Sequence, residues 1–150
     1  MHIEAPTGEA FEREFFGFSR DEVKSRVKRL GKMDKSAHVN EVRQMQADLK
    51  WNPRKPATKV AKALRDRVQS RVGKRKDVLL CCAIGTRLDF DKGTDLFFLC
   101  EGKCVTVDLT ICPRGKENPK ADFVLTLADL QNNRHYQIAD AIANHLLQAA

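Results

Sequence analysis

The chain has 150 residues and a net charge of +7; 42% of its side chains are hydrophobic and 31% are charged. This composition is typical of one globular domain and argues against a disordered chain. The longest apolar run, Val78 to Ile84, is much shorter than the roughly 20 residues of a membrane-spanning helix, and the acidic N-terminus contains no secretory signal. Five cysteines, in a chain long enough to form a core without disulfides, favour a reducing compartment. We expect the cytoplasm of a bacterial or phage-infected cell, and no contact with membranes.

The first half of the chain is predicted to be helical. Phenylalanines recur with helical spacing at positions 11, 15 and 18. The capping-box pattern from Ser19 to Glu22 predicts a helix that starts at residue 20 and ends at Gly31. A second helix is expected from Ser36 to about Trp51, because the proline that follows Asn52 disfavours the α conformation in the residue before it. Residues 52–56 are interpreted as a connector.

The third predicted helix, residues 57–72, is strongly basic. Residues 50–76 contain 11 basic side chains and a single acid, Asp66. Because duplex DNA presents dense phosphate charge, this segment predicts a surface that holds a nucleic-acid backbone with little sequence preference. Trp51 is the only aromatic residue in the segment, so stacking on single-stranded bases is poorly supported. The residues expected to contact phosphates are Arg54, Lys55, Lys59, Lys62, Arg65, Arg67, Arg71, Lys74, Arg75 and Lys76; an ordinary solvated helix face is the alternative.

The second half of the chain is predicted to form a sheet. A buried strand is expected at 78–84, and residues 86–91 are expected to continue it or to form another strand. Residues 95–100 and 104–111 predict a β-hairpin that turns at 101–103. A fourth strand is expected at 122–127.

A helix at about 134–147 is expected to close the fold. The sequence thus predicts one α/β (α+β) domain with a helical, basic N-terminal part and a small mixed, mostly antiparallel sheet around a central hairpin. Residues 1–56 are interpreted as a helical extension of a core formed by residues 57–150.

The hairpin positions two acids where they can converge. Asp95 opens the first strand, and Asp108 lies on the polar face of the second, so pairing of the strands places both toward one end. Two such carboxylates predict a Mg²⁺ or Mn²⁺ site, in which the ion polarises a phosphodiester and lowers the pKa of an attacking water. The alternative is a strand-start residue and an exposed mid-strand residue. Asp89 and Asp91 are interpreted as turn residues, although one of them is left open as a third metal carboxylate.

The segments GTDLFF (93–98) and VTVDLT (105–110) together resemble the restriction-endonuclease-like PD-(D/E)xK nuclease superfamily. Its members share a helix followed by a β-hairpin sheet, with one acid at the start of the second strand and an acid-x-lysine triplet on the third. The resemblance covers roughly residues 57–127. It implies that helix 57–72 is the first helix of that fold and that residues 78–91 are its first strand.

The resemblance also implies functional residues. Asp95 and Asp108 would be metal ligands, together with the backbone carbonyl of Leu109. Thr110 stands where the lysine of the triplet is expected, and a threonine cannot supply a cation. The superfamily tolerates a lysine from a neighbouring element, for which Lys120 is the first candidate. The other cations that remain open are Lys92, Lys103, Lys116 and Arg87.

The sequence therefore favours a metal-dependent nuclease that hydrolyses DNA phosphodiester bonds, with Asp95, Asp108 and Lys120 as catalytic residues and a homodimer as a possible assembly. The alternative is a catalytically inactive nucleic-acid-binding or assembly protein on the same fold. A protein–protein adaptor whose basic helix meets an acidic partner is a third, weaker interpretation.

Overall fold

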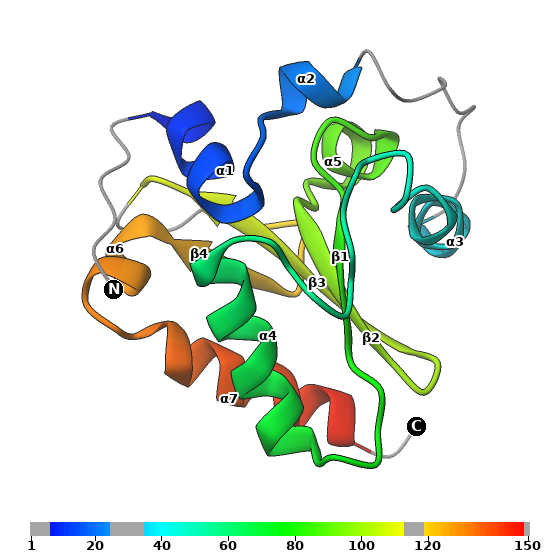
Figure 1. Ribbon diagram of the computed structural model, residues 1–150, viewed down its shortest axis with the longest axis vertical. Helices are drawn as coiled ribbons and strands as arrows, with labels where there is room; N and C mark the ends of the chain where they lie inside the picture. Colours follow the sequence, from blue (N-terminus) through cyan, green and yellow to red (C-terminus); the bar gives the residue numbers. More distant parts are fainter. Residues whose placement is uncertain (1–6, 25–34, 113–118, 149–150) are drawn as a thin grey trace.

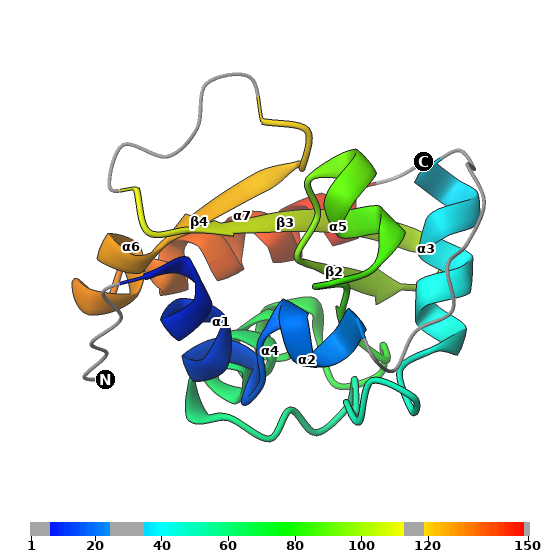
Figure 2. The ribbon, with the colours of Figure 1, turned by 90° about the horizontal axis from the view of Figure 1, so that it is seen from above.

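A four-stranded sheet with helices against both of its faces forms the centre of the molecule (Figure 1 and Figure 2). The computed structural model describes residues 7–24, 35–112 and 119–148. The helices are α1 (Gly8–Phe16), α2 (Arg20–Lys24), α3 (Lys35–Gln44), α4 (Lys59–Val72), α5 (Arg87–Lys92), α6 (Leu127–Gln131) and α7 (His135–Leu147). The strands are β1 (Leu79–Cys82), β2 (Leu96–Cys100), β3 (Lys103–Thr110) and β4 (Phe123–Thr126). None of the described helices is long and apolar enough to cross a membrane.

The sheet has the strand order β1-β2-β3-β4. β1 pairs antiparallel with β2, β2 pairs antiparallel with β3, and β4 lies parallel to β3. The hairpin between β2 and β3 turns at Glu101 and Gly102, which both have positive φ, the conformation that matches the twist of a two-residue hairpin. The prediction of a small mixed, mostly antiparallel sheet with a central hairpin is confirmed.

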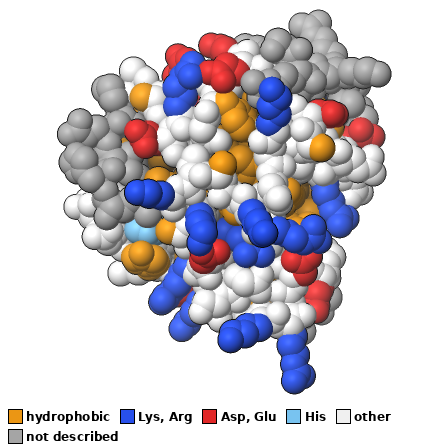
Figure 3. Space-filling model, in the orientation of Figure 1, with side chains coloured by type: hydrophobic (Ala, Val, Ile, Leu, Met, Phe, Trp, Pro, Cys, Tyr) orange, Lys and Arg blue, Asp and Glu red, His pale blue; other side chains and the backbone are white. Residues whose placement is uncertain are grey.

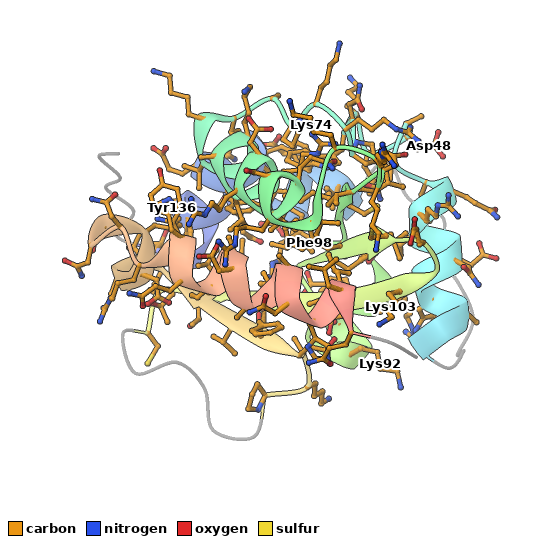
Figure 4. The ribbon with its side chains drawn as sticks, turned by 90° about the horizontal axis from the view of Figure 1, so that it is seen from below. Asp48, Lys74, Lys92, Phe98, Lys103 and Tyr136 are labelled. Carbon is orange, nitrogen blue, oxygen red and sulfur yellow. The ribbon has the colours of Figure 1, made fainter. Side chains whose placement is uncertain are left out.

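The two faces of the sheet belong to two separate cores. On one face Leu80, Phe98 and Val105 are paired across three strands and pack with α1, α4 and α7. Figure 4 shows Phe98 in this layer, between the sheet and the helices. On the other face Phe97 packs with apolar residues of α3 and with Leu88 of α5. Both faces of the hairpin are therefore covered, and polar groups on β3 lie in buried surroundings.

The basic helix forms as its pattern predicts. Thr58 caps α4, because its hydroxyl accepts a hydrogen bond from the amide of Ala61 at 3.2 Å. The helix ends before Gly73. Its apolar residues face the core, and the buried positions are Val60, Ala61, Leu64, Val68 and Val72. The C-terminal helix predicted at 134–147 is also present, as α7.

The expected strand at residues 86–91 is wrong, because this segment is helix α5. The helix begins after Thr86 and ends at Gly93, which has φ +59 and donates its amide to the carbonyl of Asp89 at 3.0 Å. Leu88 is buried while Phe90 is 50% exposed, so these two apolar residues do not line one strand face. The first strand therefore ends at Cys82, and not at residue 91 as the superfamily resemblance implied.

The N-terminal helices agree with the prediction in part. α2 starts at Arg20 as expected, but its predicted continuation to Gly31 lies outside the described residues. The capping box does not form: the Ser19 hydroxyl is buried and has no hydrogen-bond partner among the described residues, while Glu22 lies 2.6 Å from Arg13. α3 ends at Gln44, earlier than expected, and short turns lead on to Trp51.

Segments 1–56 and 57–150 share one core in the structure. Phe11, Phe15 and Trp51 belong to the same buried cluster as Leu64 of α4 and Phe98 of β2. The helical N-terminal part is thus packed directly on the sheet that carries the predicted site.

Candidate active site

The hairpin brings Asp95 and Asp108 together. Asp95 directly precedes β2, and its amide donates to the carbonyl of Val107 on β3 at 2.9 Å. Asp108 is the next residue along β3, and its carboxyl group lies close enough to that of Asp95 to raise the pKa of Asp95. Asp95 is 2% exposed and Asp108 is 5% exposed. The convergence expected from the strand pairing is therefore present, and it is buried.

A third carboxyl group comes from α5. Asp89 is buried, and its carboxylate accepts a hydrogen bond from the amide of Gly85 at 2.9 Å. Its negative charge also raises the pKa of Asp95. Of the two acids left open as a third metal carboxylate, Asp89 thus lies at the site, because residues 87–92 form a helix that returns toward the start of β2. The side chain of Asp91 lies outside the described part of the chain.

The pKa of Asp95 is raised well above its usual range. Burial is the main cause, followed by the hydrogen bond with Asp108 and by repulsion from Asp89 and Asp108. The amide of Leu109 opposes this by donating to Asp95 at 2.7 Å. Leu109 was expected to contribute its carbonyl, but the contact that the structure describes is made by its amide. Burial also raises the pKa of Asp89.

Glu12 and Arg20 complete the site and were not predicted from the sequence. Glu12, on α1, is buried, and both of its carboxylate oxygens accept hydrogen bonds from Nε of Arg20, at 3.2 and 2.9 Å. The Nη1 atom of Arg20 lies 3.6 Å from Asp89, and its Nη2 atom lies 3.5 Å from Asp95. One signal was available in the sequence: Glu12 follows Phe11 and precedes Phe15 by three residues, so it borders the apolar face of α1.

We call Glu12, Asp89, Asp95 and Asp108 the acidic cluster. The guanidinium of Arg20 pairs with three of its four carboxyl groups, those of Glu12, Asp89 and Asp95. Buried oxygen ligands of this kind are those that Mg²⁺ and Mn²⁺ prefer, and a divalent ion would relieve the repulsion that raises these pKa values. The donor set therefore fits the expected metal. Within residues 7–24, 35–112 and 119–148, no three His, Cys, Asp or Glu side chains already stand as a complete ligand group, so the metal centre remains a prediction.

Lys120 packs against Gly93, close in sequence to Asp95. A Cβ atom placed on Gly93 would meet the Cβ and Cδ atoms of Lys120 at 3.6 and 3.9 Å, so the lysine stem packs against the backbone two residues before Asp95. The hydroxyl of Thr110 accepts a hydrogen bond from the amide of Cys112 at 3.1 Å. A threonine supplies no cation. Lys103 opens β3, about 17 Å of extended strand from Asp108.

The other candidate cations are less well placed by the structure. Lys92 ends α5 and Lys103 begins β3, and Figure 4 labels both. Arg87 is the first residue of α5. Lys116 lies outside the described residues. Among the candidate lysines, Lys120 is thus the one that packs against the segment leading into Asp95.

The basic residues expected to hold phosphates divide into two groups. Six of them interact with other parts of the protein: Arg54 with Asp77, Lys62 with Asp66, Arg65 with the carbonyl of Val78, Arg67 and Arg71 with Asp140, and Lys76 with Glu101. The other four are exposed and have no ion pair among the described residues: Lys55, Lys59, Lys74 and Arg75. We call all ten the basic surface. Figure 3 shows Lys and Arg side chains gathered over the lower half of the face on which α4 lies in Figure 1.

An aromatic residue lies beside the basic surface, but it is not Trp51. Trp51 is buried, and its indole donates to the carbonyl of Leu80 at 2.8 Å. Tyr136 of α7 is 42% exposed, and the guanidinium of Arg67 lies over its ring, 5.7 Å from the centroid. The packing of α4 against α7 brings these two residues together.

A hollow of about 680 Å³ lies between α3 and the turn of the hairpin. Its lining includes Arg43, Leu79, Leu99 and Asp122. None of the four carboxyl groups of the acidic cluster lines this hollow, so it is a separate feature of the surface.

Comparison of the chain with protein-family models, curated proteins and solved structures finds no match. Its function is therefore inferred from its own residues.

Proposed function

We propose that this protein is a nuclease that uses Mg²⁺ or Mn²⁺ to hydrolyse DNA phosphodiester bonds. The observation that carries the proposal is the group of three buried carboxyl groups, Asp89, Asp95 and Asp108, where the hairpin meets α5; the other two lie close enough to raise the pKa of Asp95. Buried acids held against one another lower stability, so their presence favours a functional role. A helix followed by a hairpin, with an acid at the start of β2 and another on β3, also supports the resemblance to the restriction-endonuclease-like superfamily.

Each part of the site has a role in this proposal. Asp95 and Asp108 would hold the ion through their carboxylate oxygens, and Asp89 is placed to join them. The bound ion supplies Lewis-acid activation of the phosphodiester and of a water molecule. Lys120 would orient that water or offset negative charge at the phosphate. The four exposed cations at the two ends of α4 would hold the DNA backbone by phosphate contacts.

A second candidate function is that of an inactive nucleic-acid-binding protein. Two observations favour it: Thr110 replaces the lysine of the superfamily triplet, and Arg20 already provides a positive charge beside Asp89 and Asp95. In this case the acidic cluster is a structural remnant that Arg20 neutralises. Binding of DNA would then weaken with salt and would not depend on a divalent ion.

Cleavage of plasmid and linear DNA separates the two functions. The wild type and Asp108→Asn are compared in Mg²⁺, Mn²⁺ and EDTA. Asp48→Asn is the matched control, because Asp48 is exposed and lies outside the acidic cluster. The nuclease predicts metal-dependent cutting by the wild type and by Asp48→Asn, and loss of cutting with retained DNA binding in Asp108→Asn. Salt-sensitive binding without cutting in any metal would establish the binding protein instead.

A further inference from the structure

Arg20 is held in an unusual way for a counter-ion of buried acids. Only its Nε atom forms hydrogen bonds in the described structure, both with Glu12. Its Nη1 and Nη2 atoms lie 3.6 and 3.5 Å from Asp89 and Asp95, close enough for attraction, but neither forms a hydrogen bond with the described residues. A guanidinium has five N–H donors. The four on Nη1 and Nη2 therefore have no hydrogen-bond partner among the described residues, and two of them lie along the Nη1–Nη2 edge.

The side chain of Arg20 reaches the solvent. It is 39% exposed, whereas the side chains of Glu12, Asp89 and Asp95 are each less than 10% exposed. A group that served only to neutralise the carboxylates would be expected to satisfy its donors on them. Arg20 instead combines donors without a hydrogen-bond partner among the described residues with contact to solvent.

The backbone position of Arg20 is fixed by a close approach to Gly85. A Cβ atom on Gly85 would lie 2.8 Å from the carbonyl oxygen of Arg20 and 2.9 Å from Cβ of Val23, so no larger residue fits while α2 keeps its place. Gly85 also has φ +74, and its amide binds Asp89. One glycine thus positions both the arginine and an acid of the cluster. The guanidinium is held at its Nε by Glu12 and at its backbone by this contact.

We propose that Arg20 is the phosphate-binding residue of the site, and that Glu12 is the positioning residue that holds it. The inference rests on the proposed nuclease function. The Nη1 and Nη2 edge would donate to the non-bridging oxygens of a phosphodiester bound over Asp95 and Asp108, since a planar guanidinium matches two phosphate oxygens at once. Arg20 thereby supplies the cation that Thr110 does not. Its arrival from α2, far from the hairpin in sequence, explains why the triplet can lack a lysine.

The test measures the affinity of the full chain for a labelled duplex of mixed sequence, in Ca²⁺ and in EDTA. Arg20→Gln removes both the positive charge and the fork of paired N–H donors that the guanidinium provides. Arg20→Lys keeps the charge but loses this fork. Arg13→Gln is the matched control, because Arg13 lies on the neighbouring helix and pairs with Glu9 and Glu22 at the surface. Folding of each variant is checked by circular dichroism, and kcat and KM are measured in Mg²⁺.

We expect Arg20→Gln to bind the duplex at least ~10-fold more weakly than Arg13→Gln in Ca²⁺, with Arg20→Lys between them. Its kcat is expected to fall about 10²-fold, the loss typical of removing one donor to a developing charge. Glu12→Gln keeps an acceptor for Nε of Arg20 but removes its negative charge. We therefore expect smaller losses of duplex affinity and of kcat in this variant. Equal binding and equal kcat for Arg20→Gln and Arg13→Gln would overturn the proposal, and wild-type behaviour of Glu12→Gln would overturn the positioning role.

Two further outcomes are decisive. If Arg20→Gln does not fold, Arg20→Lys decides: several-fold weaker duplex binding supports a fork on the phosphate, and unchanged binding contradicts it. If the wild type cuts no DNA in any metal, the proposed nuclease function fails. Weaker duplex binding by Arg20→Gln than by Arg13→Gln would still establish Arg20 as a phosphate-binding residue. Equal duplex affinities of the two variants would overturn both proposals.

Discussion

The two charged regions of this molecule are built in opposite ways. In the acidic cluster, four carboxyl groups are buried, and one guanidinium, that of Arg20, pairs with three of them. On the basic surface Arg54 pairs with Asp77, Arg67 and Arg71 share Asp140, and these arginine side chains are exposed. Exposed pairs cost and contribute little, whereas buried unbalanced charge lowers stability. The difference indicates that the acidic cluster is retained because it has a function. The ion pairs within the basic surface need no functional explanation.

The strongest way to sharpen this comparison is to remove one arginine from each region. Arg20→Leu leaves buried Glu12 without its guanidinium partner, so we expect the free energy of unfolding in EDTA to fall by about 2 kcal/mol. Arg13→Leu removes two exposed pairs, with Glu9 and Glu22, and is expected to change the free energy of unfolding much less. Urea unfolding at neutral pH measures both. Equal, small losses in the free energy of unfolding would show that the acidic cluster depends on its arginine no more than the surface does.

The pH dependence of stability gives a second contrast. Burial and repulsion raise the pKa of Asp95 above its ordinary range, so the folded state holds a proton that the unfolded state has released. Stability in EDTA is therefore fully present below about pH 4, the ordinary pKa of an aspartate, and declines as pH rises toward the raised pKa. The slope is up to about 1.4 kcal/mol per pH unit for one proton.

Asp95→Asn is the variant that tests this dependence. It removes the titrating group, so the decline with rising pH is expected to flatten, and stability at pH 7 in EDTA is expected to rise by about 1 kcal/mol. Asp66→Asn, at an exposed pair on α4, is expected to leave the slope unchanged. A decline of the same steepness in Asp95→Asn would show that the cluster does not carry the raised pKa.

On the basic surface the expected change is in DNA binding and not in stability. Lys74→Ala removes an exposed cation without an ion pair among the described residues, so the slope of log affinity against log salt is expected to decrease by about 0.9. Arg65→Ala should act differently, because Arg65 donates to the carbonyl of Val78 at 2.9 Å and is needed for packing. It is expected to lower the thermal midpoint. A salt slope in Lys74→Ala equal to that of the wild type would remove this end of α4 from the DNA-binding surface.

The smallest expected effect belongs to Arg54. Its ion pair with Asp77 is short, at 2.7 Å, but both side chains are more than half exposed. Arg54→Ala is therefore expected to leave the free energy of unfolding nearly unchanged. Thermal unfolding with and without salt checks this, and a loss as large as that in Arg20→Leu would erase the contrast between the two regions.

The parts of the fold that could be predicted from the sequence are those with a strong local pattern. The apolar positions of α4 repeat with helical spacing and stand beside a run of cations, and the alternation in β3 is equally regular. The segment RLDFDK was misinterpreted because Leu88 and Phe90 alternate like strand residues. Two features favour the helix: Gly93 adopts the left-handed conformation that ends it, and Leu88 is buried against α3. The burial of Leu88 is a tertiary contact, which a local sequence pattern does not reveal.

The candidate site was predictable only where the hairpin determines it. Strand pairing is enough to place Asp95 near Asp108, because the turn at Glu101 and Gly102 fixes the register. Glu12 and Arg20 come from α1 and α2, and their approach depends on how those helices pack on the sheet. The same holds for the ion pairs of Arg67 and Arg71 with Asp140 of α7, which no local pattern in α4 reveals.

The proposed function requires the acidic cluster to bind a divalent metal ion. Titration calorimetry with Mn²⁺ measures this binding in the wild type, Asp95→Asn, Asp108→Asn and the surface control Asp48→Asn. We expect saturable binding to the wild type and to Asp48→Asn, and loss of that binding in both cluster variants. Equal heats in all four proteins, or no binding to the wild type, would show that the acidic cluster is not a metal site.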